Sequence, residues 1–153
     1  MKSDIEGTSV SNKINIMAKL NNTVFFASNE GGHFAQLTAL HDLFDKYDSV
    51  IVTDNKRANK GIPALKNVKA IEFAMAFADK REKLTKDKSK KLTHKSYLSA
   101  YWDLFKQCNA IWKKYRPKVI ISTGSNIAVP LCFIAKLHGS KFVYIETRAK
   151  VYN

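Results

Sequence analysis

The hydrophobic positions of this chain form short, mostly apolar runs separated by longer amphipathic stretches. Runs of this length, rich in β-branched and aromatic residues, are typical of buried strands in a parallel sheet. They lie at residues 23–27, 50–53, 68–73, 118–122 and 141–145. The stretches between them repeat apolar residues at helical spacing, which predicts helices. These cover residues 34–47, 96–115 and 127–138, the last ended by Gly139 as a C-cap.

The order of these elements predicts the fold class. Strands that alternate with helices, with no hairpin signal between them, indicate an α/β fold: a doubly wound, Rossmann-like parallel sheet of about five strands with helices on both faces. With the common strand order 3-2-1-4-5, the switch point lies between the first and fourth strands, and such sheets bind ligands there, outside the carboxyl ends of the strands. We therefore expect residues 29–33, residues 123–126 and Glu146 to surround one crevice.

The length of 153 residues suits one domain, which we place at residues 21–153 after a polar extension at residues 1–20. Cys108 and Cys132 are too few for a disulfide framework and form no CxxC pair, so a reducing cytoplasmic setting fits best. Cys132 is expected in the core. Because the N-terminal residues lack a signal-peptide core and no uncharged apolar run reaches membrane-spanning length, we expect any membrane contact to be peripheral.

The charge of the chain is strongly positive, with 26 Lys and Arg against 13 Asp and Glu, a net of +13. An excess of this size attracts anionic partners. It lies in residues 56–153, which hold 22 basic and six acidic side chains. Within them, residues 79–95 hold eight basic and three acidic side chains, with a solvated loop or helix face as their plain alternative. The helix at residues 96–115 has more apolar width than one face buries, and its surplus, beside several lysines, is available to lipid or to a partner chain.

The loop at residues 29–33 carries the first candidate site. Asn29 follows the first strand, and Gly31 and Gly32 precede a helix, where backbone N–H groups and the helix dipole favour an anion such as a diphosphate. A tight turn is the alternative for the two glycines. His33 at the helix start is a candidate general base or phosphate ligand, and the alternative is a helix-capping histidine.

Two further segments supply candidate residues at the same edge. Thr123, Gly124 and Ser125 offer small donors after the fourth strand, or make an ordinary turn. Glu146 follows the fifth strand, where a carboxylate points into the crevice; its alternative is a salt bridge to Arg148 or another basic neighbour. The sequence has neither GxGxxG nor GxxxxGK[ST], which disfavours a nucleotide cofactor, and no His or Cys spacing suggests a metal. We expect neither cofactor nor metal.

Three motifs, NEGGH at residues 29–33, VIISTGSNIAVPLC at 119–132 and FVYIE at 142–146, resemble those of the Alg14-like family. This family comprises acceptor-side subunits of two-component glycosyltransferases, which build N-glycan precursors and bacterial capsular polysaccharides or exopolysaccharides. The resemblance spans residues 22–152. The chain is also similar to the N-terminal half of the lipid II glycosyltransferase of peptidoglycan synthesis, which shares the GT-B architecture.

The resemblance implies one half of a split enzyme. Such a subunit binds a polyprenyl-diphosphate-linked sugar acceptor at the cytoplasmic face of the membrane, and an Alg13-like partner chain binds the UDP-sugar. By position, residues 31–33 would face the acceptor diphosphate or its reacting hydroxyl, Thr123 and Gly124 would line the same crevice, and Glu146 would lie near the interdomain cleft. Many eukaryotic members have an N-terminal transmembrane helix that this sequence does not show, so membrane contact is expected from basic and amphipathic segments or from the partner.

Two other functions fit the composition. A basic nucleic-acid-binding module is one, since positive charge with interleaved aromatic residues suits a phosphate backbone, but no recognised nucleic-acid motif supports it. A stand-alone Rossmann-like enzyme for a small molecule is the other, and the missing nucleotide fingerprint speaks against it. Steeply salt-dependent binding to generic DNA without binding to anionic vesicles would favour the first of these.

The basic segment leads to a prediction about membrane binding. We expect replacement of Lys86, Lys88, Lys90 and Lys91 by Gln to reduce cosedimentation with anionic vesicles, because each basic residue near such a surface contributes about 1 kcal/mol at best. Added salt should weaken wild-type binding in the same assay, and neutral vesicles serve as the control. Unchanged binding by the variant would place the contact elsewhere on the chain.

Overall fold

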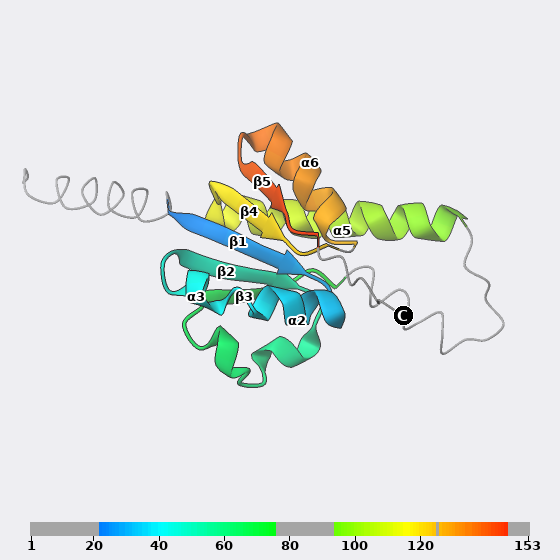
Figure 1. Ribbon diagram of the computed structural model, residues 1–153. Coiled ribbons are helices and arrows are strands. Elements are labelled where there is room, and N and C mark those ends of the chain that lie inside the picture. Colours follow the sequence, from blue (N-terminus) through cyan, green and yellow to red (C-terminus); the bar gives the residue numbers. More distant parts are fainter. Residues whose placement is uncertain (1–21, 76–93, 125, 147–153) are drawn as a thin grey trace, which may run out of the picture.

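The computed structural model describes residues 22–75, 94–124 and 126–146, and five strands within them form one parallel sheet (Figure 1). The strands are β1 (Thr23–Ser28), β2 (Asp48–Thr53), β3 (Ala70–Phe73), β4 (Val119–Ser122) and β5 (Lys141–Tyr144). Their order is β3-β2-β1-β4-β5, and every neighbouring pair is parallel. This confirms the predicted doubly wound, Rossmann-like α/β class and the switch point between β1 and β4.

The central strand β1 is buried along its whole length, and its alternating side chains serve two separate cores. Val24 and Phe26 face one side, where the ring of Phe26 meets that of Phe44 edge-on with centroids 4.8 Å apart. Phe25 and Ala27 face the other side. Because successive strand side chains point to opposite faces, each face of the sheet needs its own helical cover. The run of apolar residues without polar breaks follows from this double burial.

One face is covered by short elements from the first half of the chain (Figure 1). They are α2 (Gly32–Thr38), α3 (His41–Phe44) and the 3₁₀ turns η1 (Lys56–Asn59) and η2 (Pro63–Leu65). The single helix predicted at residues 34–47 is thus wrong, because the chain breaks between α2 and α3. At the break, the Thr38 hydroxyl donates to the Ala35 carbonyl at 2.8 Å, and Leu40 N bonds Leu37 O with the tighter 3₁₀ spacing.

The other face is covered by two longer helices, α5 (His94–Tyr115) and α6 (Ala128–His138). Both were predicted. α5 ends where Arg116 takes a φ of +46° before Pro117, and α6 ends at Gly139, whose left-handed φ of +76° makes the predicted C-cap. The polar extension at residues 1–20 and all but the last two residues of the basic segment 79–95 lie outside the described residues.

The two cysteines differ in environment. Cys108 on α5 is fully buried, and burial raises the pKa of its thiol to about 12. Cys132 on α6 is exposed, so its predicted place in the core is wrong. The apolar character of α6 misled the prediction: only the face with Leu131, Ile134 and Ala135 packs on the sheet, and the next positions along the helix turn outward.

A polar cluster fastens the end of α5 to the sheet edge. The Glu72 carboxylate on β3 accepts hydrogen bonds from Lys114 Nζ at 2.6 Å and from the Tyr115 hydroxyl at 2.5 Å. Burial raises the pKa of Glu72, but these hydrogen bonds and the Lys114 charge outweigh it, so the pKa lies below its usual value. The Tyr115 ring also meets Phe25 edge-on at 5.9 Å, which joins this cluster to the core.

The Glu72 cluster predicts acid sensitivity. Because the folded-state pKa of Glu72 is lowered, its ionised form stabilises the fold above the usual value of 4.5, and this contribution is lost as the pH falls through the folded pKa. We expect Glu72→Gln to lower the free energy of unfolding at neutral pH and to cost progressively less as the pH drops below 4.5. Urea unfolding across this range measures the difference, and a difference independent of pH would contradict the assignment.

Candidate functional site

The loops after β1 and β2 and the start of α6 are held together by one side chain, Asn29. Its Nδ2 donates to Asp54 Oδ2 at 2.5 Å, and its Oδ1 accepts from the backbone N of Ile127 at 3.1 Å. Asn29, predicted to bind the acceptor, therefore uses both ends of its amide within the protein. Asn29 thus acts as a clamp across the switch point: it joins the loop after β1 to Asp54 after β2 and to the start of α6 after β4.

Asp54 is a residue that sequence reasoning did not single out. It follows β2 directly, and its second oxygen accepts from the backbone N of Glu30 at 2.6 Å. The carboxylate thus orders the loop that leads to the glycines and α2. An acid directly after a buried strand was the signal available in the sequence, the same signal that marked Glu146.

The glycine loop lies open at the start of α2. Gly31 is the N-cap residue with a φ of +103°, a conformation that side chains other than glycine rarely adopt, and its carbonyl accepts from the backbone N of Phe34 and Ala35. A side-chain carbon built on Gly31 or Gly32 would meet no atom within 4 Å. The conformation therefore requires Gly31, while the space in front of both residues is free for a ligand.

His33 is linked to the loop after β4 by two reciprocal hydrogen bonds. Its Nδ1 lies 2.8 Å from the Thr123 carbonyl oxygen, and the Thr123 hydroxyl donates to the His33 carbonyl at 2.7 Å. A carbonyl oxygen only accepts, so Nδ1 must carry the proton, and in the neutral ring Nε2 is left with the lone pair. α2 has no side-chain cap, so His33 is not a capping histidine. Its exposed ring presents a basic nitrogen at the carboxyl edge of the sheet.

Gly124 and Tyr144 complete this group. Gly124 has a φ of +114°, and a side-chain carbon built on it would lie 3.1 Å from the Tyr144 hydroxyl oxygen and 3.3 Å from two atoms of the His33 ring. The absence of a side chain therefore lets segments from α2, the β4–α6 loop and β5 approach one another. Tyr144 was not predicted as a site residue, although it stands in the motif at residues 142–146 and more than half of its surface is exposed. We call His33, Thr123, Gly124 and Tyr144 the edge cluster.

The structure does not bring Glu146 into the edge cluster. Glu146 is exposed beyond the end of β5, and within the described part of the chain it makes no hydrogen bond with His33. Arg148, its alternative salt-bridge partner, lies outside the described residues. So do Ser125 and the four lysines predicted to contact the membrane, Lys86, Lys88, Lys90 and Lys91.

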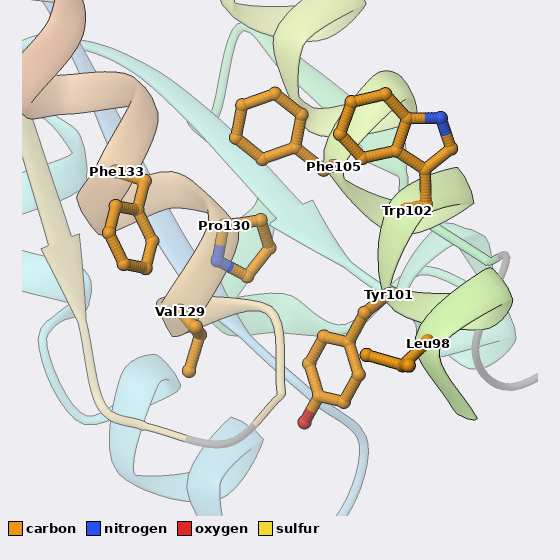
Figure 2. A pocket seen from close by; sticks show the side chains of 7 residues that line it. All are labelled: Leu98, Tyr101, Trp102, Phe105, Val129, Pro130 and Phe133. Carbon is orange, nitrogen blue, oxygen red and sulfur yellow. The ribbon is translucent and has the colours of Figure 1, made fainter. Parts of the chain in front are cut away.

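A second concave surface lies between α5 and α6, and Figure 2 shows its side chains in two facing rows. It has a volume of about 260 Å³ and is open to solvent. We call it the α5–α6 groove; it is lined by Leu98, Tyr101, Trp102, Phe105, Val129, Pro130 and Phe133. It accounts for the surplus apolar width predicted for α5, because Leu98 and Trp102 are 71% and 61% exposed.

The described residues show neither a metal-binding group nor a membrane-spanning helix. Over residues 22–75, 94–124 and 126–146, no group of three His, Cys, Asp or Glu side chains is placed to hold a metal ion. Over the same ranges, no helix has both the length and the apolar character needed to cross a membrane. The edge cluster itself offers the ring nitrogen of His33, the hydroxyl groups of Thr123 and Tyr144, and backbone amides.

Comparison of the sequence with protein-family models and with curated proteins finds no match in either case.

The Asn29 clamp predicts a stability effect. Asn29→Ala leaves the Asp54 carboxylate and the Ile127 N–H without their partner, and loss of such hydrogen bonds costs about 1–3 kcal/mol. We expect a decrease of that size in the free energy of unfolding, measured by urea denaturation. The matched control is Asn67→Ala at an exposed loop position, which should change stability by less than about 0.5 kcal/mol. Equal effects of the two substitutions would contradict the clamp.

Proposed function

We propose that this chain is the acceptor-binding subunit of a split glycosyltransferase. It would act in polysaccharide biosynthesis, for capsule or exopolysaccharide, or in lipid-linked oligosaccharide biosynthesis, and would recruit an Alg13-like partner that binds the UDP-sugar. The observation that carries the proposal is the edge cluster, in which a histidine whose Nδ1–H is held by the Thr123 carbonyl, and whose Nε2 carries the lone pair, stands at the switch point of a parallel sheet. The resemblance of residues 29–33, 119–132 and 142–146 to the Alg14-like family gives the substrate class.

The fold supports a division of labour between two chains. GT-B enzymes form their site between two Rossmann-like halves, and the described residues make one sheet of that kind. The sequence has neither of the Gly-rich phosphate-binding fingerprints that mark dinucleotide and P-loop sites. The open space in front of Gly31 and Gly32 suits an acceptor diphosphate on the side that this chain contributes.

The geometry suggests how the edge cluster would work. In sugar transfer the acceptor hydroxyl forms a bond to the anomeric carbon, the bond from that carbon to UDP breaks, and the hydroxyl proton must be taken up. His33 Nε2 is the acceptor for this proton. The Thr123 carbonyl holds Nδ1–H, keeps the ring in the required tautomer and stabilises the imidazolium that forms. The Tyr144 hydroxyl is close enough to Gly124 to orient a ligand at the same place.

One alternative assignment of the base stays within the same proposal. Glu146 is exposed near the end of β5, so a partner chain that closes over this edge would allow its carboxylate to be the base, with His33 as a diphosphate ligand.

The proposed membrane association rests on the exposed aromatic residues of α5 and on the basic charge of the chain. These would keep the subunit at the cytoplasmic face of an anionic membrane as a peripheral protein.

His33 provides the decisive test in the complex with the Alg13-like chain. We expect His33→Ala to lower kcat by roughly 10²- to 10⁴-fold, the usual loss for a general base. His33→Asn is the sharper variant, because an amide N–H can keep the bond to the Thr123 carbonyl while the basic nitrogen is removed. It should be as inactive as His33→Ala but retain wild-type stability and partner binding. Steady-state kinetics with UDP-sugar and lipid-linked acceptor measures each effect.

The same kinetics separates the alternatives. A raised acceptor KM with unchanged kcat in the His33 variants would assign His33 to binding, and a loss of kcat in Glu146→Gln would then make Glu146 the base. Full activity in both sets of variants would refute the site. The isolated chain should show no appreciable transfer, and robust turnover without a partner would refute the split enzyme.

A further inference from the structure

Tyr101 links the α5–α6 groove to the loop that carries Thr123 and Gly124 of the edge cluster. Its ring lines the groove, and its hydroxyl donates to Asn126 Oδ1 at 3.0 Å. Asn126 belongs to the same β4–α6 connection as Thr123 and Gly124. Figure 2 shows the Tyr101 ring at one end of the groove, with its oxygen directed away from the other aromatic side chains. The α5–α6 groove therefore begins beside the polar loop of the candidate site.

The groove is uniformly apolar where a ligand would contact it. Pro130 lies in the first turn of α6, where its missing N–H removes no intrahelical hydrogen bond, so its ring faces the groove without cost to the helix. Across the gap, the Trp102 and Phe105 rings stack with centroids 5.9 Å apart and planes at 7°. Phe133 is 59% exposed and Val129 is 49% exposed. Apolar side chains left in water at this density favour a hydrocarbon ligand.

The size of the groove selects among possible occupants. A stable dimer interface covers about 800 Å² and about 20–30 residues on each partner, far more than this narrow groove presents. Pockets for drug-sized ligands have volumes of about 300–1,000 Å³. At about 260 Å³ the groove fits a short length of an extended, branched hydrocarbon chain.

We infer that the α5–α6 groove holds the first isoprene units of the lipid chain whose diphosphate lies in the open space before Gly31 and Gly32, beside the edge cluster. This inference rests on the proposed function, because it takes the acceptor to be an isoprenoid diphosphate. It adds a second subsite for that acceptor: a molecule with an anionic end and a hydrocarbon chain matches a polar loop and an apolar groove that the Tyr101–Asn126 hydrogen bond joins. The remainder of a long chain would stay in the bilayer.

The test compares three probes on the full chain by isothermal titration calorimetry: farnesyl diphosphate, inorganic diphosphate and farnesol. Phe133→Gln places a neutral polar group in the groove, and Leu137→Gln is the matched control one turn further along α6, outside the groove. Both side chains are exposed, so both variants should fold, which circular dichroism checks. Neither substitution changes the net charge seen by the anionic probes.

We expect farnesyl diphosphate to bind wild-type protein at least about tenfold more tightly than inorganic diphosphate, because the chain buries apolar surface. Phe133→Gln should remove most of this gain, roughly tenfold in Kd, while Leu137→Gln keeps it. Inorganic diphosphate should bind all three proteins alike. Equal affinity of farnesyl diphosphate for wild type and Phe133→Gln would overturn the inference. An equal loss of affinity for farnesyl diphosphate in Phe133→Gln and Leu137→Gln would also overturn it. That result would mean that the probe adsorbs to the exposed apolar surface of α6 in general and not to the groove.

The remaining outcomes separate this inference from the proposed function. If farnesol binds with the same dependence on Phe133 and the diphosphate adds no affinity, the groove subsite stands and the acceptor site at the edge cluster fails. If inorganic diphosphate binds but the chain adds nothing, the groove subsite fails and the edge cluster stands. Self-association in sedimentation experiments that Phe133→Gln abolishes would assign the groove to a second copy and overturn the inference.

Discussion

All five strands of the sheet run in one direction, and this constraint decides where polar side chains can gather. Each strand must be followed by a connection that returns along a face of the sheet, so all carboxyl ends lie at one edge. From β1 the chain moves outward to β2 and β3, and α5 then carries it back to β4 on the other side of β1. The connections after β1 and β4 cover opposite faces, and they part at the position where the edge cluster lies.

This divergence must be bridged, and the chain does so with short polar contacts rather than with apolar packing. Asn29 joins the loop after β1 to Asp54 and to the start of α6, while His33 and Thr123 exchange two hydrogen bonds across the same gap. The residues that hold the two halves of the sheet together are therefore neighbours of those that would meet a ligand. A ligand at this edge would find the backbone already ordered, which reduces the entropy lost on binding.

The sequence predicted the class and the two long helices because these follow from patterns within each element, whereas the strand order was assumed from the commonest arrangement of such sheets. The buried run of β1 and the wide apolar stripe of α5 can be recognised from the sequence of each element alone. The edge cluster was only partly predictable: His33, Thr123 and Gly124 stood out by their position after strands, whereas Tyr144 and Asp54 did not. Their contacts join residues 20 or more positions apart, and a pattern within one element carries no information about them. The exposed position of Cys132 was missed for a related reason, since the apolar residues of a mostly apolar helix do not show which of its faces meets the sheet.

α5 divides its side chains between two environments. Leu104, Cys108 and Ile111 are buried under the sheet, while Leu98 and Trp102 remain in water beside α6. The buried set accounts for the stability of the helix, so the exposed set is not needed for folding. Lys106 Nζ lies 5.8 Å from the centre of the Trp102 ring, which places a cation beside an exposed aromatic surface.

The Asn29 clamp also limits how this sequence can vary. The position needs one group that donates to a carboxylate and another that accepts from a backbone N–H, and the asparagine side chain has both. Aspartate, which differs by a single atom, would set two carboxylates against each other, and leucine, of similar shape, would leave both partners without a hydrogen bond. Glu30 is exposed and engages the clamp through its backbone N–H, while its side chain makes only an exposed ion pair with Arg57 at 3.8 Å, so its side chain is far less constrained. Two adjacent polar residues of one loop thus differ greatly in how far their side chains can change without loss of structure.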